Sequence, residues 1–384
     1  MKSQVFRLWR SAMAWLSMAL VSASTLGAPA AARPNRSEVA APVHHVFLIV
    51  LENEPFDVTF GTKSLAPYLA HELTKEGALL TQYYGTGHNS LDNYITLISG
   101  QAPNPDTQND CSTYVEFRAT ASKLDTNGQL TGQGCIFPMQ VKTLADQLHA
   151  AGLSWKGYME GMGSDPSRET AQCGHVAIGS RDHTNGESLK DRYADKHNPF
   201  VYFHSIIDDP AYCGSHVVPL DDMAKDLQKV ATTPNFAFIT PDLCHDGHDA
   251  PCRNGEPGGL ISADQFLRIW VPRITNSAAF RKDGLLIITF DEGTDAKACC
   301  GEQGLPGGPQ PGQYGPGGGR IGAVMLSPFI RPGTVSDHPY NHYSTLRSIE
   351  QWFGLPYLGY AKADGVPVFD HDVFTQSPQD TKVK

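Results

Sequence analysis

The amino-acid sequence predicts an α/β fold built around a mostly parallel β-sheet. Two observations support this prediction. Four continuous apolar runs are typical of strands that are buried on both faces, and segments with helical spacing of apolar residues lie between them. Buried strands that alternate with helices are the pattern of α/β domains with a parallel sheet.

The first apolar run, His45–Leu51, is rich in branched side chains, as expected for a strand covered on both faces. Three similar runs indicate further strands: Phe236–Thr240, Gly284–Phe290 and Ile321–Ser327. The segments with helical spacing are Pro67–Glu76, Asn93–Ser99, Val141–Ala151, Leu220–Ala231, Ser262–Val271 and Tyr343–Gly354. By composition, Gly304–Gly319 is a flexible surface loop, and the weaker alternative is a phosphate-cradling loop.

Residues 1–30 have the features of a secretory signal peptide, with a basic start, an apolar stretch and small residues at Ala28–Ala30. The apolar stretch is shorter than the ~18 residues of a membrane span, so we expect no transmembrane segment. An uncleaved anchor is the alternative. We therefore expect a secreted or periplasmic protein with a flexible lead-in over residues 31–41 and a single domain over residues 42–384.

The formal net charge of −10 argues against a nucleic-acid partner, because nucleic-acid binders carry a basic patch. It says little about the substrate, since a bound metal ion can reverse the local field of an acidic site.

The sequence contains eight cysteines, all after the signal segment, and an even count in an oxidising compartment indicates up to four disulfides. A zinc site is the alternative, but no pair has the CxxC spacing. Pairing of neighbours in the chain would give Cys111–Cys135, Cys173–Cys213, Cys244–Cys252 and Cys299–Cys300. The sequence alone leaves the pairing open.

Polar and acidic residues follow three of the predicted strands, namely Glu52 with Asn53, the segment Asp242–Asp249, and Asp291 with Glu292. Ligands of parallel sheets bind at the carboxyl ends of the strands, so these residues can converge on one point. Carboxylate and amide oxygens suit a divalent metal ion such as Ca²⁺, Mg²⁺ or Mn²⁺. The alternative for each pair is that it caps the following helix.

Ser90 lies in the polar segment Thr86–Tyr94, at the start of a predicted helix. The N–H groups of a helix N-terminus suit phosphate, and a nearby metal ion would lower the pKa of the hydroxyl and make it a nucleophile. The alternative is that Ser90 only caps the helix.

The segment His245–Asp249 places several potential ligands around one glycine. Asp246 and His248 can ligate the same metal ion if their side chains face the same way. A surface turn rich in Asp and Gly is an equally good interpretation. Taken singly, His197, Asn198 and His342 favour structural roles.

A series of motifs spread in order from His45 to Leu355 resembles the phosphoesterase family that contains bacterial acid phosphatases and phospholipases C. The motifs are His45–Asp57 with Gly61, Thr81–Gly85, His88–Tyr94, Trp155–Glu160, Lys196–Pro199, Pro241–His248, Thr289–Glu292, Ser327–Gly333 and Asn341–Glu350. The resemblance implies an alkaline-phosphatase-like three-layer α/β sandwich around the central sheet.

The resemblance also implies roles for individual residues. Ser90 would be the nucleophile that is transiently phosphorylated, and His197 or His248 would protonate the leaving alcohol. The expected metal ligands are Glu52, Asn53, Asp291, Glu292, Asp246 and His342. The expected substrate contacts are Asn198, His88, Asn93 and His245. Ligation by histidine would shift the preferred metal toward zinc or iron.

Two departures from the family pattern stand out. Asn89 and Asp92 replace the usual prolines around Ser90, so the loop that carries the serine is expected to differ in shape. Asp291 and Glu292 lack the Asp-His pair that follows in many relatives, which leaves the number of metal ions open.

We therefore expect a secreted metal-dependent phosphomonoesterase that acts on a small phosphorylated substrate. The alternatives are a phosphodiesterase of the phospholipase C type, acting on a phospholipid headgroup, and a non-catalytic module that binds metal or glycan. The sequence does not reveal the oligomeric state.

Overall fold

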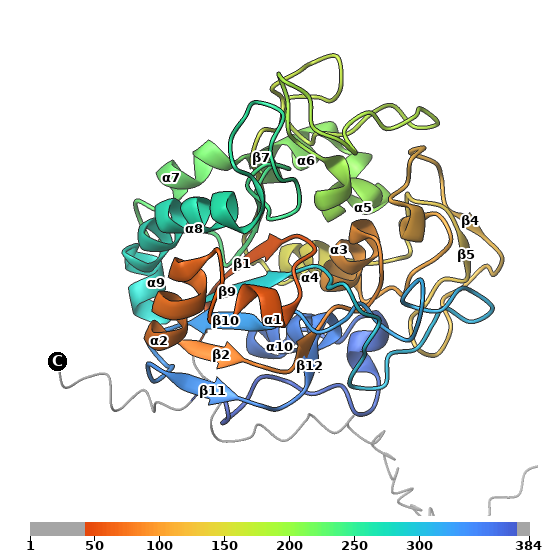
Figure 1. Ribbon diagram of the computed structural model, residues 1–384. Helices are drawn as coiled ribbons and strands as arrows, with labels where there is room; N and C mark the ends of the chain where they lie inside the picture. The colour runs from red at the N-terminus through yellow and green to blue at the C-terminus, as the bar shows by residue number, and fades with distance from the viewer. Residues whose placement is uncertain (1–42, 375–384) are drawn as a thin grey trace, which may run out of the picture. The chain divides into compact units, whose positions relative to one another are not determined.

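The computed structural model describes residues 43–374, and Figure 1 shows how their helices and strands are arranged. The predicted signal peptide (1–30) and lead-in (31–41) lie outside the described residues and stay predictions, as does the extent of the domain. Among the described helices, none combines the length and apolar character needed to cross a membrane.

Eight strands form the central sheet, in the order β11-β2-β10-β9-β1-β8-β6-β7. The five neighbours β9, β1, β8, β6 and β7 run parallel to one another, whereas β10 is antiparallel to both β9 and β2. Three strands have the predicted bounds: β1 (His45–Leu51), β8 (Phe236–Thr240) and β9 (Gly284–Phe290). The predicted α/β fold with a mostly parallel sheet is confirmed.

The sequence missed the shorter or more polar strands of this sheet. They are β2 (Ala78–Leu80), β6 (Trp155–Met159), β7 (Val217–Pro219) and β11 (Thr334–Ser336), and the predicted fourth strand shortens to β10 (Ala323–Leu326). Two small sheets pair β3 (Tyr83–Tyr84) with β12 (Tyr340–Asn341), and β4 (Arg118–Ala119) with β5 (Gly132–Gln133).

The helices surround the sheet and differ from the prediction mainly at their ends. They are α1 (Phe56–Thr59), a π-helical turn (Tyr68–Leu73) leading into α2 (Thr74–Glu76), α3 (Ser90–Ser99), α4 (Leu144–Ala150), α5 (His204–Ile207), α6 (Pro210–His216), α7 (Met223–Asp226), α8 (Gly259–Thr275), α9 (Ala278–Asp283) and α10 (His342–Phe353). Short 3-10 turns cover Thr107–Asn109, Asp195–His197, Pro199–Tyr202, Leu220–Asp222 and Gly359–Lys362. The predicted helix Leu220–Ala231 is wrong beyond Asp226.

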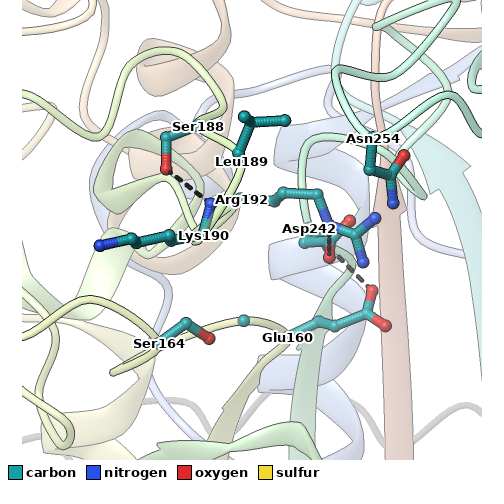
Figure 2. A pocket seen from close by; sticks show the side chains of 9 residues that line it. Glu160, Ser164, Ser188, Leu189, Lys190, Arg192, Asp242 and Asn254 are labelled. Atoms are coloured by element: carbon teal, nitrogen blue, oxygen red, sulfur yellow. Dashed lines mark hydrogen bonds and ion pairs between the residues drawn. The ribbon is translucent and has the colours of Figure 1, made fainter.

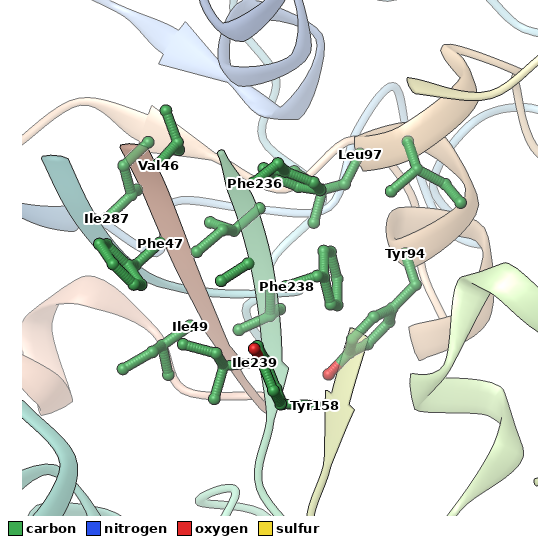
Figure 3. Close-up of a cluster of buried hydrophobic side chains, with 14 of the residues drawn as sticks. Val46, Phe47, Ile49, Tyr94, Leu97, Tyr158, Phe236, Phe238, Ile239 and Ile287 are labelled. Carbon is green, nitrogen blue, oxygen red and sulfur yellow. The ribbon is translucent and has the colours of Figure 1, made fainter. Parts of the chain in front are cut away.

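Side chains of the central strands pack against helices on opposite faces of the sheet (Figure 3). Phe47 of β1 contacts Phe280 of α9, with ring centroids 6.5 Å apart. The next residue, Leu48, pairs with Phe238 of β8, and Phe238 contacts Tyr94 of α3 at 6.1 Å. Paired residues share a face and successive residues alternate, so α9 and α3 cover opposite faces and the sheet is the middle of three layers.

Four disulfides join neighbouring cysteines in the pattern considered from the sequence: Cys111–Cys135, Cys173–Cys213, Cys244–Cys252 and Cys299–Cys300. The glycine-rich segment Gly304–Gly319 is an irregular loop, as predicted, but its end is buried rather than free at the surface. A Cβ on Gly318 would lie 2.2 Å from the carbonyl oxygen of Gly87, so only a glycine permits this approach to the segment before Ser90.

Helix α10 buries an acidic side chain that makes stability depend on pH. Glu350 accepts a hydrogen bond from the N–H of Leu358 at 2.9 Å, while its Oε2 lacks a partner. Burial raises the pKa of Glu350 to about 9. Above the ordinary pKa of 4.5 the unfolded chain releases this proton, whereas the folded chain keeps it. The stability that the protonated carboxyl contributes is therefore fully present below pH 4.5 and is lost as the pH rises through about 9.

We expect Glu350→Gln to leave the free energy of unfolding unchanged near pH 4 and to raise it at pH 8.5, on the order of a few kcal/mol, because the amide has no proton to lose. Urea unfolding at the two pH values measures this difference. The exposed Glu76→Gln serves as control. An equal effect of Glu350→Gln at both pH values would contradict the assignment.

Candidate functional site

The carboxyl ends of β1, β8 and β9 meet at one edge of the sheet, as the sequence predicted. The N–H of Glu52 bonds to the carbonyl of Asp246 at 2.9 Å, and the N–H of Asp291 bonds to the carbonyl of Leu51 at 2.8 Å. These backbone bonds bring together the three acidic segments that follow the strands. The side chains of Glu52, Asp246 and Asp291 are all buried there.

Glu52 is the centre of the contacts at this edge. Its Oε2 accepts hydrogen bonds from Ser90 Oγ at 2.9 Å and from Asn53 Nδ2 at 2.8 Å. Its Oε1 lies 3.0 Å from His197 Nε2, and His197 Nδ1 lies 3.7 Å from Asp246 Oδ2. One donor atom each from Glu52, His197 and Asp246 lies within 4.8 Å of the others, close enough to hold a single ion.

Several atoms of this group are buried without a hydrogen-bond partner in the described structure. They are Glu52 Oε1, both ring nitrogens of His197, Asp246 Oδ2 and Asp291 Oδ2. The other oxygen of Asp291 accepts from the N–H groups of Asn53 and Glu292, at 2.9 and 2.6 Å. Buried polar atoms almost always form hydrogen bonds. A group of buried oxygen and nitrogen atoms that lack such bonds therefore fits the ligands of a cation. Carboxylates together with an imidazole suit zinc, iron or manganese.

The carboxylates at this edge repel one another. Burial, followed by the charge of Glu52, raises the pKa of both Asp246 and Asp291 well above the usual range. Burial and the charge of Asp291 do the same to the pKa of Glu292. A positive charge placed between them would stabilise the ionised forms.

His197 is held as a neutral ring. It stacks on Tyr94, with ring centroids 5.1 Å apart and an interplanar angle of 14°. Burial, reinforced by the ammonium of Lys196, lowers the pKa of His197 to about 3. A neutral imidazole offers a lone pair to a metal ion but has no extra proton to give to a leaving group.

Ser90 is the first residue of α3 and is 2% exposed. The residue before it, Asn89, has a φ of 65°, a left-handed conformation that a proline cannot adopt. The loop therefore does differ in shape from the proline-containing motif that it resembles. Asn53, beside Glu52, also has a positive φ, of 58°. Six non-glycine residues of the described chain have a positive φ, and Asn53, Asn89 and Asp110 are the three of them that lie at this site.

Two residues of this region were not identified from the sequence. Lys196 Nζ lies 3.5 Å from Ser90 Oγ and 3.1 Å from Asp110 Oδ2, and the lysine side chain is 12% exposed. Lys196 belongs to a motif that the sequence does show, directly before His197. Asp110 lies in no recognised motif, so the sequence offered no signal for it.

Other predicted metal ligands lie beside the cluster rather than within it. His342 uses Nε2 to contact the carbonyl of Asp291 at 2.6 Å and Nδ1 to contact the hydroxyl of Tyr83 at 3.1 Å. Both ring nitrogens of His342 therefore have hydrogen-bond partners, and the residue holds the backbone of Asp291 in place. Glu292 Oε2 lies 3.9 Å from His88 Nε2. His88 is thus near the cluster, and burial lowers its pKa.

The predicted substrate contacts and the second catalytic histidine are scattered around the cluster. Asn198 is buried and donates to the hydroxyl of Tyr193 at 2.9 Å. His248 has a half-exposed side chain and contacts Asp249 at 2.8 Å. This hydrogen bond raises the pKa of His248 despite its partial burial. The roles predicted for these residues stay predictions.

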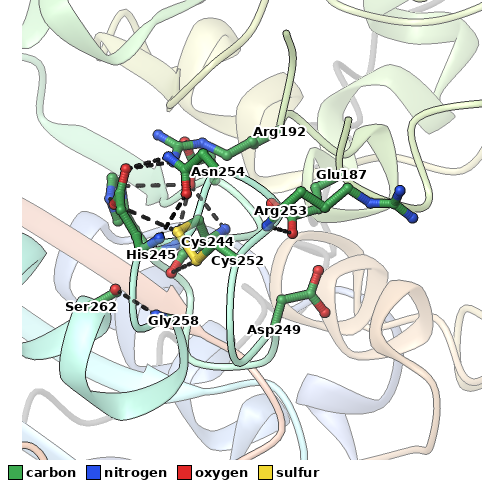
Figure 4. Close-up of a disulfide and its surroundings, with 12 residues drawn as sticks. Glu187, Arg192, Cys244, His245, Asp249, Cys252, Arg253, Asn254, Gly258 and Ser262 are labelled. Carbon is green, nitrogen blue, oxygen red and sulfur yellow. Dashed lines mark hydrogen bonds and ion pairs between the residues drawn. A yellow bond between two sulfur atoms is a disulfide. The ribbon is translucent and has the colours of Figure 1, made fainter. Parts of the chain in front are cut away.

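His245 lies in a separate ion-pair network next to the Cys244–Cys252 disulfide (Figure 4). Its Nδ1 contacts Glu160 at 3.0 Å and its Nε2 contacts Glu256 at 3.2 Å. Burial opposes the charge of the ring, but Glu160 raises the pKa of His245 to about 9. The structure therefore places His245 as a charged support of the loop that carries Asp246.

A polar cavity of about 340 Å³ opens beside this network (Figure 2). Arg192 crosses it, and its Nε contacts Asp242 Oδ2 at 2.8 Å. The lining residues are Glu160, Gly161, Ser164, Ser188, Leu189, Lys190, Arg192, Asp242 and Asn254.

Residues 63–356 match the model of the phosphoesterase family. The probable acid phosphatase of Kluyveromyces lactis is 24% identical over 82% of this chain and 59% of its own length. The phosphate-repressible acid phosphatase of Penicillium chrysogenum is 27% identical over 81% of this chain and 59% of its own length. The phosphatidylinositol-3-phosphatase of Mycobacterium tuberculosis is 26% identical, with coverages of 85% and 82%. The chain thus spans little more than half the length of the fungal relatives.

Among solved structures, a Vibrio parahaemolyticus protein of the alkaline phosphatase superfamily matches 86% of this chain and 72% of its own, at 14% identity and a TM-score of 0.48. The phosphonate monoester hydrolase of Agrobacterium radiobacter matches 88% and 78%, at 12% identity and a TM-score of 0.43.

The side-chain amide of Asn93 forms hydrogen bonds with the backbone of the loop that precedes Ser90. Its Oδ1 accepts from the N–H groups of Thr86 and Gly87, both at 2.9 Å. Its Nδ2 donates to the carbonyls of Gly87 and Asn89, at 3.1 and 3.2 Å. These bonds give Asn93 a role in shaping the loop, beside the predicted contact with substrate.

We expect Asn93→Ala to lower the free energy of unfolding by at least about 1–3 kcal/mol, because it leaves buried N–H groups without an acceptor. Chemical denaturation measures this loss, with the exposed Asn276→Ala as control. A variant with unchanged stability and a raised KM would instead indicate that Asn93 acts mainly as a substrate contact.

Proposed function

The chain belongs to the phosphoesterase family, and we propose that it is a metal-dependent phosphomonoesterase that uses Ser90 as its nucleophile. The observation that carries the proposal is the hydrogen bond from Ser90 Oγ to Glu52 Oε2. It lies beside buried carboxylate oxygens and imidazole nitrogens that lack hydrogen-bond partners and can ligate a metal ion. Relatives named as acid phosphatases support the monoester substrate class.

The residues that would hold the metal ion are Glu52, His197, Asp246 and Asp291, because their unpartnered atoms lie at the same edge of the sheet. When bound, the ion would supply a Lewis acid that stabilises charge on the phosphoryl oxygens and lowers the pKa of the serine hydroxyl. The presence of His197 in this group favours zinc, iron or manganese over calcium or magnesium.

The chain's own residues then account for the transfer. Ser90 Oγ attacks phosphorus in line with the leaving oxygen, and its proton passes to Glu52 Oε2, which already accepts it in a hydrogen bond. The bond from phosphorus to the alcohol breaks and leaves a phosphoserine at position 90. Ser90 begins a ten-residue helix, whose dipole favours negative charge at this end.

The sequence left the proton donor for the alcohol open between two histidines, and we assign it to His248. Its hydrogen bond with Asp249 favours the protonated ring, and its half-exposed side chain can exchange protons with solvent. His197 is buried and neutral, so it is the poorer acid. In the second half-reaction water attacks the phosphorus of the phosphoserine and gives its proton to His248. The bond from phosphorus to Ser90 Oγ breaks, inorganic phosphate leaves, and Ser90 Oγ recovers its proton from Glu52.

We further propose that the protein acts in the periplasm or outside the cell. The four disulfides support this location, because such bonds persist in oxidising compartments.

We expect Ser90→Ala to lower kcat for p-nitrophenyl phosphate by at least about 10³-fold, because no other group replaces the nucleophile. Its metal content, measured by plasma mass spectrometry, should equal that of the wild type. Glu52→Gln should lose both the activity and the metal. Ser99→Ala, in the same helix, serves as control. Full turnover by Ser90→Ala would refute the proposed mechanism.

We expect kcat/KM for p-nitrophenyl phosphate to exceed that for bis-p-nitrophenyl phosphate by more than about tenfold, or 1.4 kcal/mol, because the monoester carries an additional negative charge toward the metal ion. Incubation with EDTA should abolish both activities. A preference for the bis-ester would favour the phosphodiesterase alternative.

A further inference from the structure

Lys196 places a buried positive charge beside the proposed nucleophile, and the mechanism above does not use it. Its Nζ lies 3.5 Å from Ser90 Oγ. The carboxylate of Asp110, whose Oδ2 lies 3.1 Å from Nζ, favours the ammonium form of this lysine.

Asp110 fixes this ammonium group in relation to the first turn of α3. Its Oδ2 contacts Lys196 Nζ at 3.1 Å, while its Oδ1 accepts from the N–H of Leu91 at 3.0 Å. The next residue, Cys111, is tied by a disulfide to Cys135. One carboxylate thus joins the lysine to the helix turn that carries Ser90.

An ammonium group has three N–H donors, and Asp110 and Ser90 account for two contacts. A phosphorus atom bonded to Ser90 Oγ carries its oxygens one bond further out, within reach of a donor that lies beside Oγ. The surrounding carboxylates would repel these oxygens, so a fixed cation on this side lowers the energy of the transferring group.

Accepting the proposed function, we propose that Lys196 is a further catalytic residue, which donates a hydrogen bond to a non-bridging oxygen of the phosphoryl group as it moves to Ser90. Lys196 stays protonated throughout and takes no part in the proton transfers. Asp110 is a positioning residue that acts through Lys196.

The test compares Lys196→Met, Lys196→Arg and the double variant Asp110→Asn/Lys196→Met with the wild type. The exposed Lys75→Met, on α2, is the matched control. The measurements are kcat and KM for p-nitrophenyl phosphate, the competitive inhibition constant of inorganic phosphate, the metal content and the melting temperature. The double variant removes both partners, so no unpaired carboxylate remains to unfold the protein.

We expect Lys196→Met and the double variant to lose about 10²–10³-fold in kcat, the usual effect of removing one donor to a transition-state oxygen. Inhibition by phosphate should weaken in the same variants, while the metal content stays at the wild-type level. Lys196→Arg should recover part of the rate, because it restores a charged donor. Lys75→Met should behave as the wild type.

A double variant that folds, binds metal and keeps the wild-type kcat and phosphate inhibition would overturn the role of Lys196. Failure of the proposed function is a separate result, since Ser90→Ala would then keep its turnover whatever the lysine variants do. If Lys196→Met fails to fold, the double variant decides the question.

Discussion

Buried carboxylates that repel one another converge at the carboxyl ends of three parallel strands, and the other residues of the site lie around them. Glu52 and Asp291 follow β1 and β9 directly, and Asp246 lies in the loop after β8, so the pairing of these three strands brings the carboxylates together. Like charges a few ångströms apart in a low dielectric interact strongly. A cation placed among them would stabilise their ionised forms. The unpartnered oxygens of Glu52, Asp246 and Asp291 are the atoms that such a cation would contact.

The other residues of the site hold the segments around this acidic edge in place. His342, at the start of α10, contacts the carbonyl of Asp291, and Asn93 accepts hydrogen bonds from the backbone of the segment before Ser90. The network around His245 anchors the loop that carries Asp246. Each support lies on an element packed against the sheet, so the fold and the geometry of the site are coupled.

The central strands could be predicted because each is a continuous apolar run, and the acidic cluster followed from what lies at their ends. Strand β6 was missed because Lys156 and Gly157 interrupt its apolar pattern. Ser90 resembled a helix cap in the sequence, but the cap position belongs to Asn89, and Ser90 Oγ contacts Glu52 and Lys196 instead. Asp110 and Lys196 are 86 residues apart and meet through tertiary packing, which no local pattern encodes.

We propose that one metal ion is held beside Ser90 by Glu52, His197 and Asp246. Anomalous diffraction from crystals grown with zinc or manganese tests this most directly. We predict one strong anomalous peak within bonding distance of Glu52, His197 and Asp246. Glu160, Asp242 and His245 also bring three donor atoms close together, and a peak there with none at Glu52 would contradict this assignment.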